Sequence, residues 1–130
     1  MKKNVVTCFI KYKGKILILK RSDKVRTHKG KWAGVSGYVE ENEKPEFTAY
    51  KEVKEEVGLG KDEIVLKKVG MPFEIEREDW VVHTFLFETE KEPNISIDWE
   101  HTEYRWIQPD EIENYDTVPK LKEALMLVLS

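Results

Sequence analysis

Hydrophobic residues along the chain fall mainly into short runs that are typical of strands. Two of these runs, at residues 4–12 and 15–20, flank Lys13 and Gly14, and this arrangement predicts a hairpin. Residues 32–40 form a short segment that is interrupted by glycines, and we expect it to be extended. The later apolar runs predict further strands at residues 62–69, 80–88 and 103–107.

Two segments instead have the features of helices. Pro45 suits the first turn of a helix, because its missing N–H has no partner there, and Gly58 supplies a left-handed end, so we predict a helix from about Pro45 to Val57. Its buried face should consist of Phe47, Ala49, Tyr50, Val53 and Val57. Residues 118–129 predict a second amphipathic helix, after a helical turn that begins at Pro109. Helices interspersed with strands predict a layered domain of the α/β or α+β class.

Length and composition narrow the class of protein. The 130 residues fit one domain, residues 1–130, and 40% hydrophobic with 36% charged residues is typical of a globular protein. The net charge of −3 gives no reason to expect DNA as a partner. The single cysteine, Cys8, excludes an internal disulfide. No segment has the form of a membrane helix or a signal peptide, so we expect the protein in the cytoplasm. For its oligomeric state we expect a monomer or a homodimer.

The first predicted helix carries a concentration of acid. Glu52, Glu55 and Glu56 lie at relative positions i, i+3 and i+4, which places the three carboxylates together on one flank. Like charges at this spacing disfavour a helix by about 0.2–0.5 kcal/mol per pair, so the cluster needs neutralising charge. Two interpretations are open: a solvated face with Lys51 and Lys54 as partners, or a site for a divalent cation.

The residues around this cluster follow a longer pattern. Gly37 is followed after five residues by Glu43 and, after seven more, by the run from Lys51 to Leu59, which reads Lys-Glu-Val-Lys-Glu-Glu-Val-Gly-Leu. This pattern resembles the Nudix box, which reads glycine, five residues, Glu, seven residues, Arg-Glu-apolar-x-Glu-Glu-x-Gly-apolar. Every defined position matches except that Lys51 stands where the family has arginine. The resemblance implies a Nudix hydrolase with an α/β/α sandwich around a mixed sheet.

By position, the resemblance implies a set of magnesium ligands, with manganese as a substitute. Magnesium prefers carboxylate and carbonyl oxygens and retains some of its waters, and it both masks phosphate charge and places a water for attack. The backbone carbonyl would come from Gly37 or Ser36. Glu43 would lie near the metal in a supporting role. The carboxylate ligands implied are Glu52, Glu55 and Glu56.

Lys51 and a later acidic residue complete the catalytic candidates. A lysine keeps the charge of the family arginine but loses its planar fork, and its easiest partner is Glu55, one turn on. Many family members add an acidic residue from a later loop, and here Asp98, Glu100 and Glu103 are in range. We prefer Glu100, because residues 100–106 are similar to a segment of bacterial dihydroneopterin triphosphate pyrophosphohydrolases. The catalytic candidates are therefore Glu52, Glu100 and Lys51.

Candidate substrate-binding residues come from a basic loop and from aromatic side chains. In the loop at residues 20–31, Arg21 and Arg26 are the better candidates for binding phosphate, because a guanidinium can grip it in a bidentate way. Trp80, Phe73 and Trp32 are candidates for stacking on a base, with ordinary burial in the core as the alternative for each.

The function implied is that of a pyrophosphohydrolase. It would hydrolyse a phosphoanhydride bond in a nucleoside diphosphate linked to another moiety. A common oxidised-nucleotide-sanitising pattern has Pro-Gly-Gly before the box, where this chain has Val35-Ser36-Gly37. The corresponding segment of the dihydroneopterin triphosphate enzymes is similar and also lacks proline, and this resemblance favours a nucleoside or pterin triphosphate as substrate. The alternative is a Nudix-fold module that binds or senses a nucleotide without catalysis, and the intact acidic set argues against it.

Overall fold

The two N-terminal apolar runs form the predicted hairpin in the computed structural model, which describes residues 2–129. β1 (Lys3–Tyr12) and β2 (Lys15–Arg21) are joined by Lys13 and Gly14, whose φ angles of 49° and 80° suit a tight hairpin turn. The two strands pair with each other only beside this turn, where Lys11 and Tyr12 face Ile16 and Lys15. Beyond the turn they diverge.

The divergence lets β1 take other partners. One edge of β1 pairs along its length with β7 (Trp80–Glu88) in parallel, and the other edge pairs with the antiparallel β4 (Val35–Tyr38). Because β1 has both parallel and antiparallel neighbours, the eight-stranded sheet is mixed.

The other strands extend this sheet on both sides. β3 (Trp32–Ala33) and β8 (His101–Ile107) pair with β2, whereas β5 (Val65–Val69) and β6 (Phe73–Ile75) pair with β7. Short 3-10 helices lie between strands or after them, at η1 (Lys61–Glu63), η2 (Glu76–Glu78) and η3 (Pro109–Asn114).

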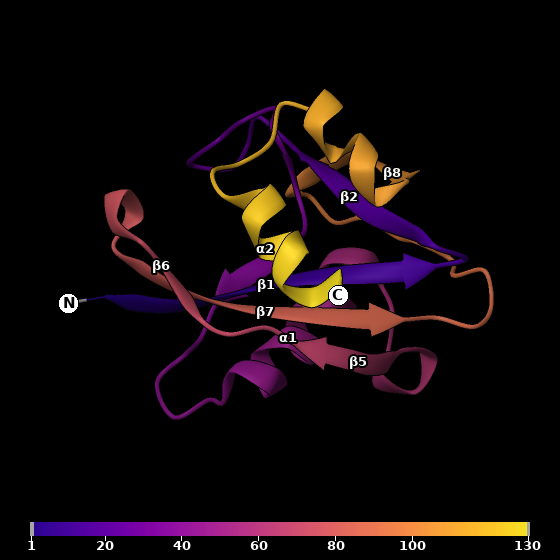
Figure 1. Ribbon diagram of the computed structural model, residues 1–130, viewed down its shortest axis with the longest axis horizontal. Coiled ribbons are helices and arrows are strands. Elements are labelled where there is room, and N and C mark those ends of the chain that lie inside the picture. Colours follow the sequence, from indigo (N-terminus) through magenta and orange to yellow (C-terminus); the bar gives the residue numbers. More distant parts are fainter. Residues whose placement is uncertain (1, 130) are drawn as a thin grey trace.

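A helix covers each face of the sheet (Figure 1). The alternation along β1 directs Cys8 and Ile10 to a core shared with α1 (Pro45–Val57), and Phe9 to a core shared with α2 (Leu121–Leu129). The predicted α/β/α sandwich around a mixed sheet is therefore confirmed. None of the helices within residues 2–129 is long and apolar enough to cross a membrane.

The helix predicted over Pro45–Val57 is confirmed at both ends, but its buried face was predicted incorrectly in one position. Gly58 adopts the left-handed conformation and donates its N–H to the carbonyl of Lys54. Phe47 is 59% exposed, whereas its neighbour Thr48 is fully buried. Thr48 turns inward because its Oγ1 donates a hydrogen bond to Glu43 Oε1 at 2.7 Å.

Three other features of the fold differ from the prediction for local reasons. The strand expected at residues 62–69 begins only at Val65, because the preceding residues form η1. The helix expected at residues 118–129 begins at Leu121, after Lys120 with its left-handed φ of 68°. The strand β6 was not predicted, since three residues give too short a pattern to recognise.

Candidate active site

The acidic flank of α1 lies directly against β4. A Cβ atom on Gly37 would fall 2.5 Å from Cδ of Glu52, closer than real Cβ atoms approach. The glycine therefore leaves the space in which the Glu52 side chain lies. This close approach gives a physical reason for a glycine at the first position of the box.

Glu56 is the most enclosed carboxylate of the cluster. Its side chain is 1% exposed, and Oε1 accepts a long hydrogen bond of 3.4 Å from the backbone N–H of Ser36. Oε2 has no hydrogen-bonding partner among the residues that the structure describes. Burial, and then the neighbouring Glu52 carboxylate, raises the pKa of Glu56 well above its ordinary value.

The three carboxylates of the helix differ in environment. Glu52 is half-buried, and burial followed by the charge of Glu55 raises its pKa, with contact to Glu56 acting in the opposite direction. Glu55 is exposed. The interpretation of the cluster as a uniformly solvated acidic face is therefore wrong for Glu56, whose buried Oε2 has no hydrogen-bonding partner within residues 2–129.

This oxygen supports a fit between the site and a divalent cation. A cation would supply the missing partner of Glu56 Oε2, with Glu52 and Glu55 as neighbouring oxygen donors. Within residues 2–129, no group of three or more His, Cys, Asp or Glu side chains is placed so that it could hold a metal ion. A cation here would therefore need waters or a backbone carbonyl as further ligands, and Mg²⁺ is a hard cation that prefers oxygen ligands and keeps several waters.

The loop before β8 contributes a further carboxylate. Glu100 lines the same cavity as Glu52 and Glu55, and burial followed by the charge of Asp98 raises its pKa. Its backbone is held on both sides: its carbonyl accepts the N–H of Ser22 at 2.7 Å, and its own N–H donates to Asp98 Oδ1 at 3.2 Å. This places Glu100 beside the helix carboxylates.

The other two acidic candidates from this region have other partners. Asp98 Oδ1 lies 3.0 Å from Nδ1 of His101. Glu103 lies on β8, 3.9 Å from Lys20 Nζ and 3.4 Å from Arg105 Nη2. Glu100 thus remains the preferred late-loop carboxylate.

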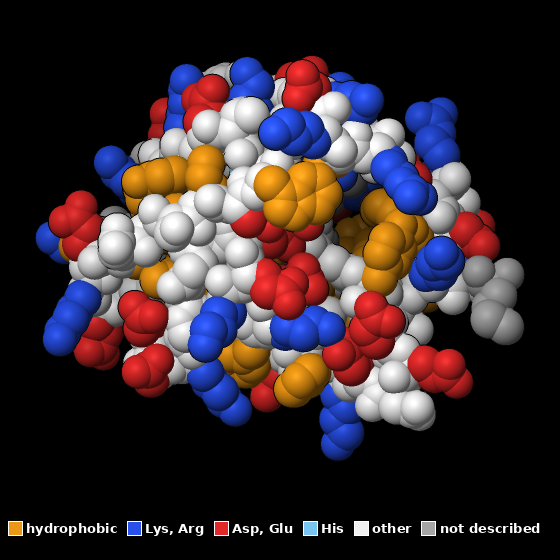
Figure 2. Space-filling view, turned by 180° about the vertical axis from the view of Figure 1, so that it is seen from behind, with side chains coloured by type: hydrophobic (Ala, Val, Ile, Leu, Met, Phe, Trp, Pro, Cys, Tyr) orange, Lys and Arg blue, Asp and Glu red, His pale blue; other side chains and the backbone are white. Residues whose placement is uncertain are grey.

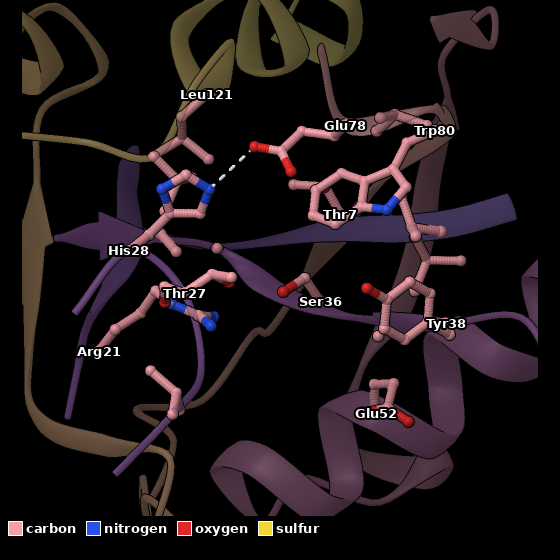
Figure 3. A pocket seen from close by; sticks show the side chains of 18 of the residues that line it. Thr7, Arg21, Thr27, His28, Ser36, Tyr38, Glu52, Glu78, Trp80 and Leu121 are labelled. Carbon is pink, nitrogen blue, oxygen red and sulfur yellow. Dashed lines mark hydrogen bonds and ion pairs between the residues drawn. The ribbon is translucent and has the colours of Figure 1, made fainter. Parts of the chain in front are cut away.

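The acidic cluster opens into a cavity of about 740 Å³. Figure 3 shows Glu52 below this cavity, Arg21 and His28 on one side, and Trp80 and Tyr38 on the other. Figure 2 shows acidic side chains gathered beside a hollow in the surface, with hydrophobic and basic side chains around it. Acidic, basic and aromatic side chains therefore line one and the same cavity.

The basic loop contributes one wall of the cavity. Arg21 and Arg26 both line it, and Arg21 Nε donates to the carbonyl of Thr27 at 3.1 Å, which keeps the loop turned over the cavity. His28 Nε2 lies 3.1 Å from Glu78 Oε1 of η2. This pair connects the loop with the segment between β6 and β7 (Figure 3).

The aromatic candidates separate into two groups. Trp80 and Phe73 line the cavity, and Trp80 packs edge to face against Tyr38 with a centroid distance of 6.0 Å. Trp32 is 7% exposed and packs against Tyr115 in the core on the α2 side. For Trp32 the structure therefore favours the alternative of ordinary burial.

Lys51 has a different partner from the one expected. Its Nζ lies 2.7 Å from Glu43 Oε2, not beside Glu55. Thr48 Oγ1 and the backbone N–H of Glu40 both donate to the other oxygen of Glu43, so this carboxylate is held in place to receive the lysine. The lysine, Thr48 and Glu40 contacts lower the pKa of Glu43, and the Glu43 carboxylate raises that of Lys51.

We predict that Lys51 supports the box through Glu43. Lys51→Ala should lower turnover only several-fold, because the pair is partly exposed and Thr48 still holds Glu43. Lys51→Arg should leave turnover unchanged or raise it, since a guanidinium can make two hydrogen bonds to one carboxylate. Turnover and the Mg²⁺ concentration for half-maximal rate measure both effects. A Lys51→Ala variant equal to the parent in both would show Lys51 to be an ordinary surface lysine.

Several cavity residues were missed by the sequence analysis. Tyr38 and Trp99 line the cavity with 51% and 63% of their surface exposed, and no pattern in the sequence distinguishes them from core aromatics. The pairing of His28 with Glu78, which are 50 residues apart, has no sequence signal.

The fold and the box together agree with comparisons to known proteins. Among solved structures, the chain is similar to an Ap4A hydrolase of C. elegans (17% identity, 95% of this chain and 93% of the other, TM-score 0.78). It is also similar to a MutT protein of Methanosarcina mazei Go1 (25% identity, 96% and 91%, TM-score 0.75). A third is the dihydroneopterin triphosphate pyrophosphohydrolase of E. coli (23% identity, 96% and 94%, TM-score 0.74). Because residues 1–128 match the model of the NUDIX domain, the chain belongs to the NUDIX domain family.

Proposed function

We propose that this protein is a divalent-cation-dependent pyrophosphohydrolase that cuts a phosphoanhydride bond in a nucleoside or pterin triphosphate. The observation that carries the proposal is the buried Oε2 of Glu56, which has no hydrogen-bonding partner among the described residues. It lies close to Glu52 and Glu100, which line a cavity that basic residues also line. Two similar solved structures, an Ap4A hydrolase and a dihydroneopterin triphosphate pyrophosphohydrolase, support a small phosphorylated substrate.

In this proposal the helix provides the cation site. Glu52, Glu55 and Glu56 would hold Mg²⁺ or Mn²⁺ together with the backbone carbonyl of Gly37 or Ser36. A bound Mg²⁺ masks phosphate charge and lowers the pKa of a coordinated water. The raised pKa of Glu100 suits a group that takes a proton from the attacking water, since a general base works best with a pKa near the working pH.

The walls of the cavity would bind the rest of the substrate. Arg21 and Arg26 can each form two hydrogen bonds to phosphate oxygens. Such contacts would orient the phosphate chain across the acidic cluster. Trp80 offers an apolar surface for a base or pterin ring on the opposite side from Arg21 (Figure 3). A substrate with a charged chain and a planar ring therefore matches both walls.

A panel of substrates tests the proposed reaction. Nucleoside triphosphates, dihydroneopterin triphosphate, nucleotide sugars and dinucleoside polyphosphates are each incubated with the protein and Mg²⁺, and the products are separated. We expect a triphosphate to yield pyrophosphate and the corresponding monophosphate. Tight binding of a panel member that stays intact would instead support the alternative, a nucleotide-sensing module without catalysis.

A further inference from the structure

A buried histidine connects the carboxylates of α1 with the loop before β8. His101 is the first residue of β8, and its side chain, like that of Glu56, is 1% exposed. Its Nε2 lies 3.7 Å from Glu56 Oε1, and its Nδ1 lies 3.0 Å from Asp98 Oδ1. Polar groups buried this deeply cost free energy unless they are partnered, so these contacts constrain the side chains of His101 and Glu56.

Asp98 determines how the imidazole is oriented. An ionised carboxylate can only accept hydrogen bonds, so the hydrogen lies on Nδ1 and is donated to Asp98. The turn is closed by the backbone N–H of His101, which donates to the carbonyl of Asp98 at 3.2 Å. The side chain of Asp98 thereby orients the ring while its carbonyl holds the backbone of His101, and Nε2 lies 3.7 Å from Glu56 Oε1.

The two carboxylate oxygens of Glu56 therefore have different surroundings. Oε1 lies 3.7 Å from Nε2 of His101 and accepts the N–H of Ser36, whereas Oε2 has no hydrogen-bonding partner among residues 2–129. We propose that His101, oriented by Asp98, is a positioning residue: its imidazole packs against Oε1 of Glu56, limits how the carboxylate can turn, and so leaves Oε2 facing a divalent cation. The inference rests on the metal dependence of the proposed function.

The test is the Mn²⁺ affinity of the full-length, substrate-free protein, measured by calorimetric titration. His101→Asn keeps an amide near Asp98 but has no atom in the place of Nε2, whereas His101→Gln extends an amide toward Glu56. We expect His101→Asn to weaken Mn²⁺ binding by about tenfold or more, the usual effect of losing a group that orients a metal ligand. His101→Gln should recover part of this loss.

A variant on the other face of the sheet controls for a general loss of stability. Val128 of α2 is 1% exposed and lies in the core on the side away from α1. Val128→Ala should lower the midpoint of thermal unfolding and leave Mn²⁺ affinity unchanged. The positioning role would be overturned if both His101 variants bound Mn²⁺ with the affinity of the parent. It would also be overturned if Val128→Ala lost as much Mn²⁺ affinity as His101→Asn.

The readout separates this inference from the proposed reaction. If the parent hydrolyses its substrate but the His101 variants bind Mn²⁺ as tightly as the parent, the inference alone is refuted. Weakened binding in His101→Asn, with no hydrolysis of any panel substrate by the parent, would refute the reaction alone. Absence of Mn²⁺ binding by the parent would refute the inference and the metal site together.

Discussion

Replacing Glu56 with glutamine is expected to lower turnover by roughly two orders of magnitude or more, while raising the thermal stability of the metal-free protein. The amide removes the negative charge that would bind a cation through Oε2. Changes to groups that merely orient a metal ligand already cost about 10–100-fold, so the loss of a ligand should lie at or beyond the upper end. Steady-state turnover and the midpoint of thermal unfolding measure the two effects.

The stability effect follows from the raised pKa of Glu56. The folded protein binds this proton more tightly than the unfolded chain does, because burial raises the pKa above its ordinary value of 4.5. The free energy of unfolding therefore falls as the pH rises from about 4.5 through the folded-state pKa. Glutamine carries no such proton, so Glu56→Gln should unfold at a higher temperature than the parent at neutral pH in the presence of chelator.

Glu46→Gln is the matched control. Glu46 lies on the first turn of the same helix and is exposed, away from the acidic cluster. Its turnover should equal that of the parent. Similar losses of turnover at Glu46 and Glu56 would identify helix stability, not a metal ligand, as the cause.

Gly37→Ala is expected to lower turnover at least tenfold with little change in the midpoint of thermal unfolding. The new Cβ would lie 2.5 Å from Cδ of Glu52, so the carboxylate must leave its place on β4. The clash involves only the Glu52 side chain, from Cγ outward, so this side chain and not the backbone has to move and the fold should stay intact. A displaced ligand costs catalysis much more than stability, because the productive geometry of such a site tolerates only small shifts.

Gly60→Ala separates this effect from the general cost of changing a glycine. Gly60 has an ordinary φ of −78°, and the nearest atom to its added Cβ is Asp62 Oδ1 at 3.1 Å, on a flexible side chain. Turnover in Gly60→Ala should be close to that of the parent. Parent-like turnover in Gly37→Ala as well would refute the placement of Glu52 against β4 in the working enzyme.

The helix that carries the acidic cluster could be predicted because its signals are local. Pro45 and Gly58 mark its ends through backbone chemistry that depends on no distant residue. The same holds for the turn at Lys13 and Gly14, where left-handed angles fix the hairpin. Helix periodicity also placed Glu52, Glu55 and Glu56 on one flank.

The different environments of these glutamates could not be predicted in this way. A helical wheel treats Glu55 and Glu56 as neighbours. In the folded chain, however, His101 at the start of β8, 45 residues later, lies against the buried Glu56, whereas Glu55 is exposed. For the same reason the sequence predicted Glu55 as the partner of Lys51. The actual partner, Glu43, lies before the helix and is placed by Thr48, a contact that requires the folded chain.

The cavity walls were the least predictable part of the site. Arg21 and Arg26 stood out through their basic loop, whereas His28 and Glu78 meet only because the loop folds over η2. Trp80 and Trp32 have similar apolar surroundings in the sequence, yet only Trp80 lines the cavity. Long-range packing, which leaves no period or spacing in the sequence, decides between such residues.

The release of pyrophosphate as a function of added metal tests the central claim most directly. The best substrate of the panel is incubated with the parent protein in excess chelator, then with Mg²⁺ or Mn²⁺ added beyond the chelator, with product formation followed throughout. We predict no release in chelator and full release once free metal is present, with Glu56→Gln remaining nearly inactive in both conditions. Release at the full rate in excess chelator would contradict the assignment of the α1 carboxylates as a metal site.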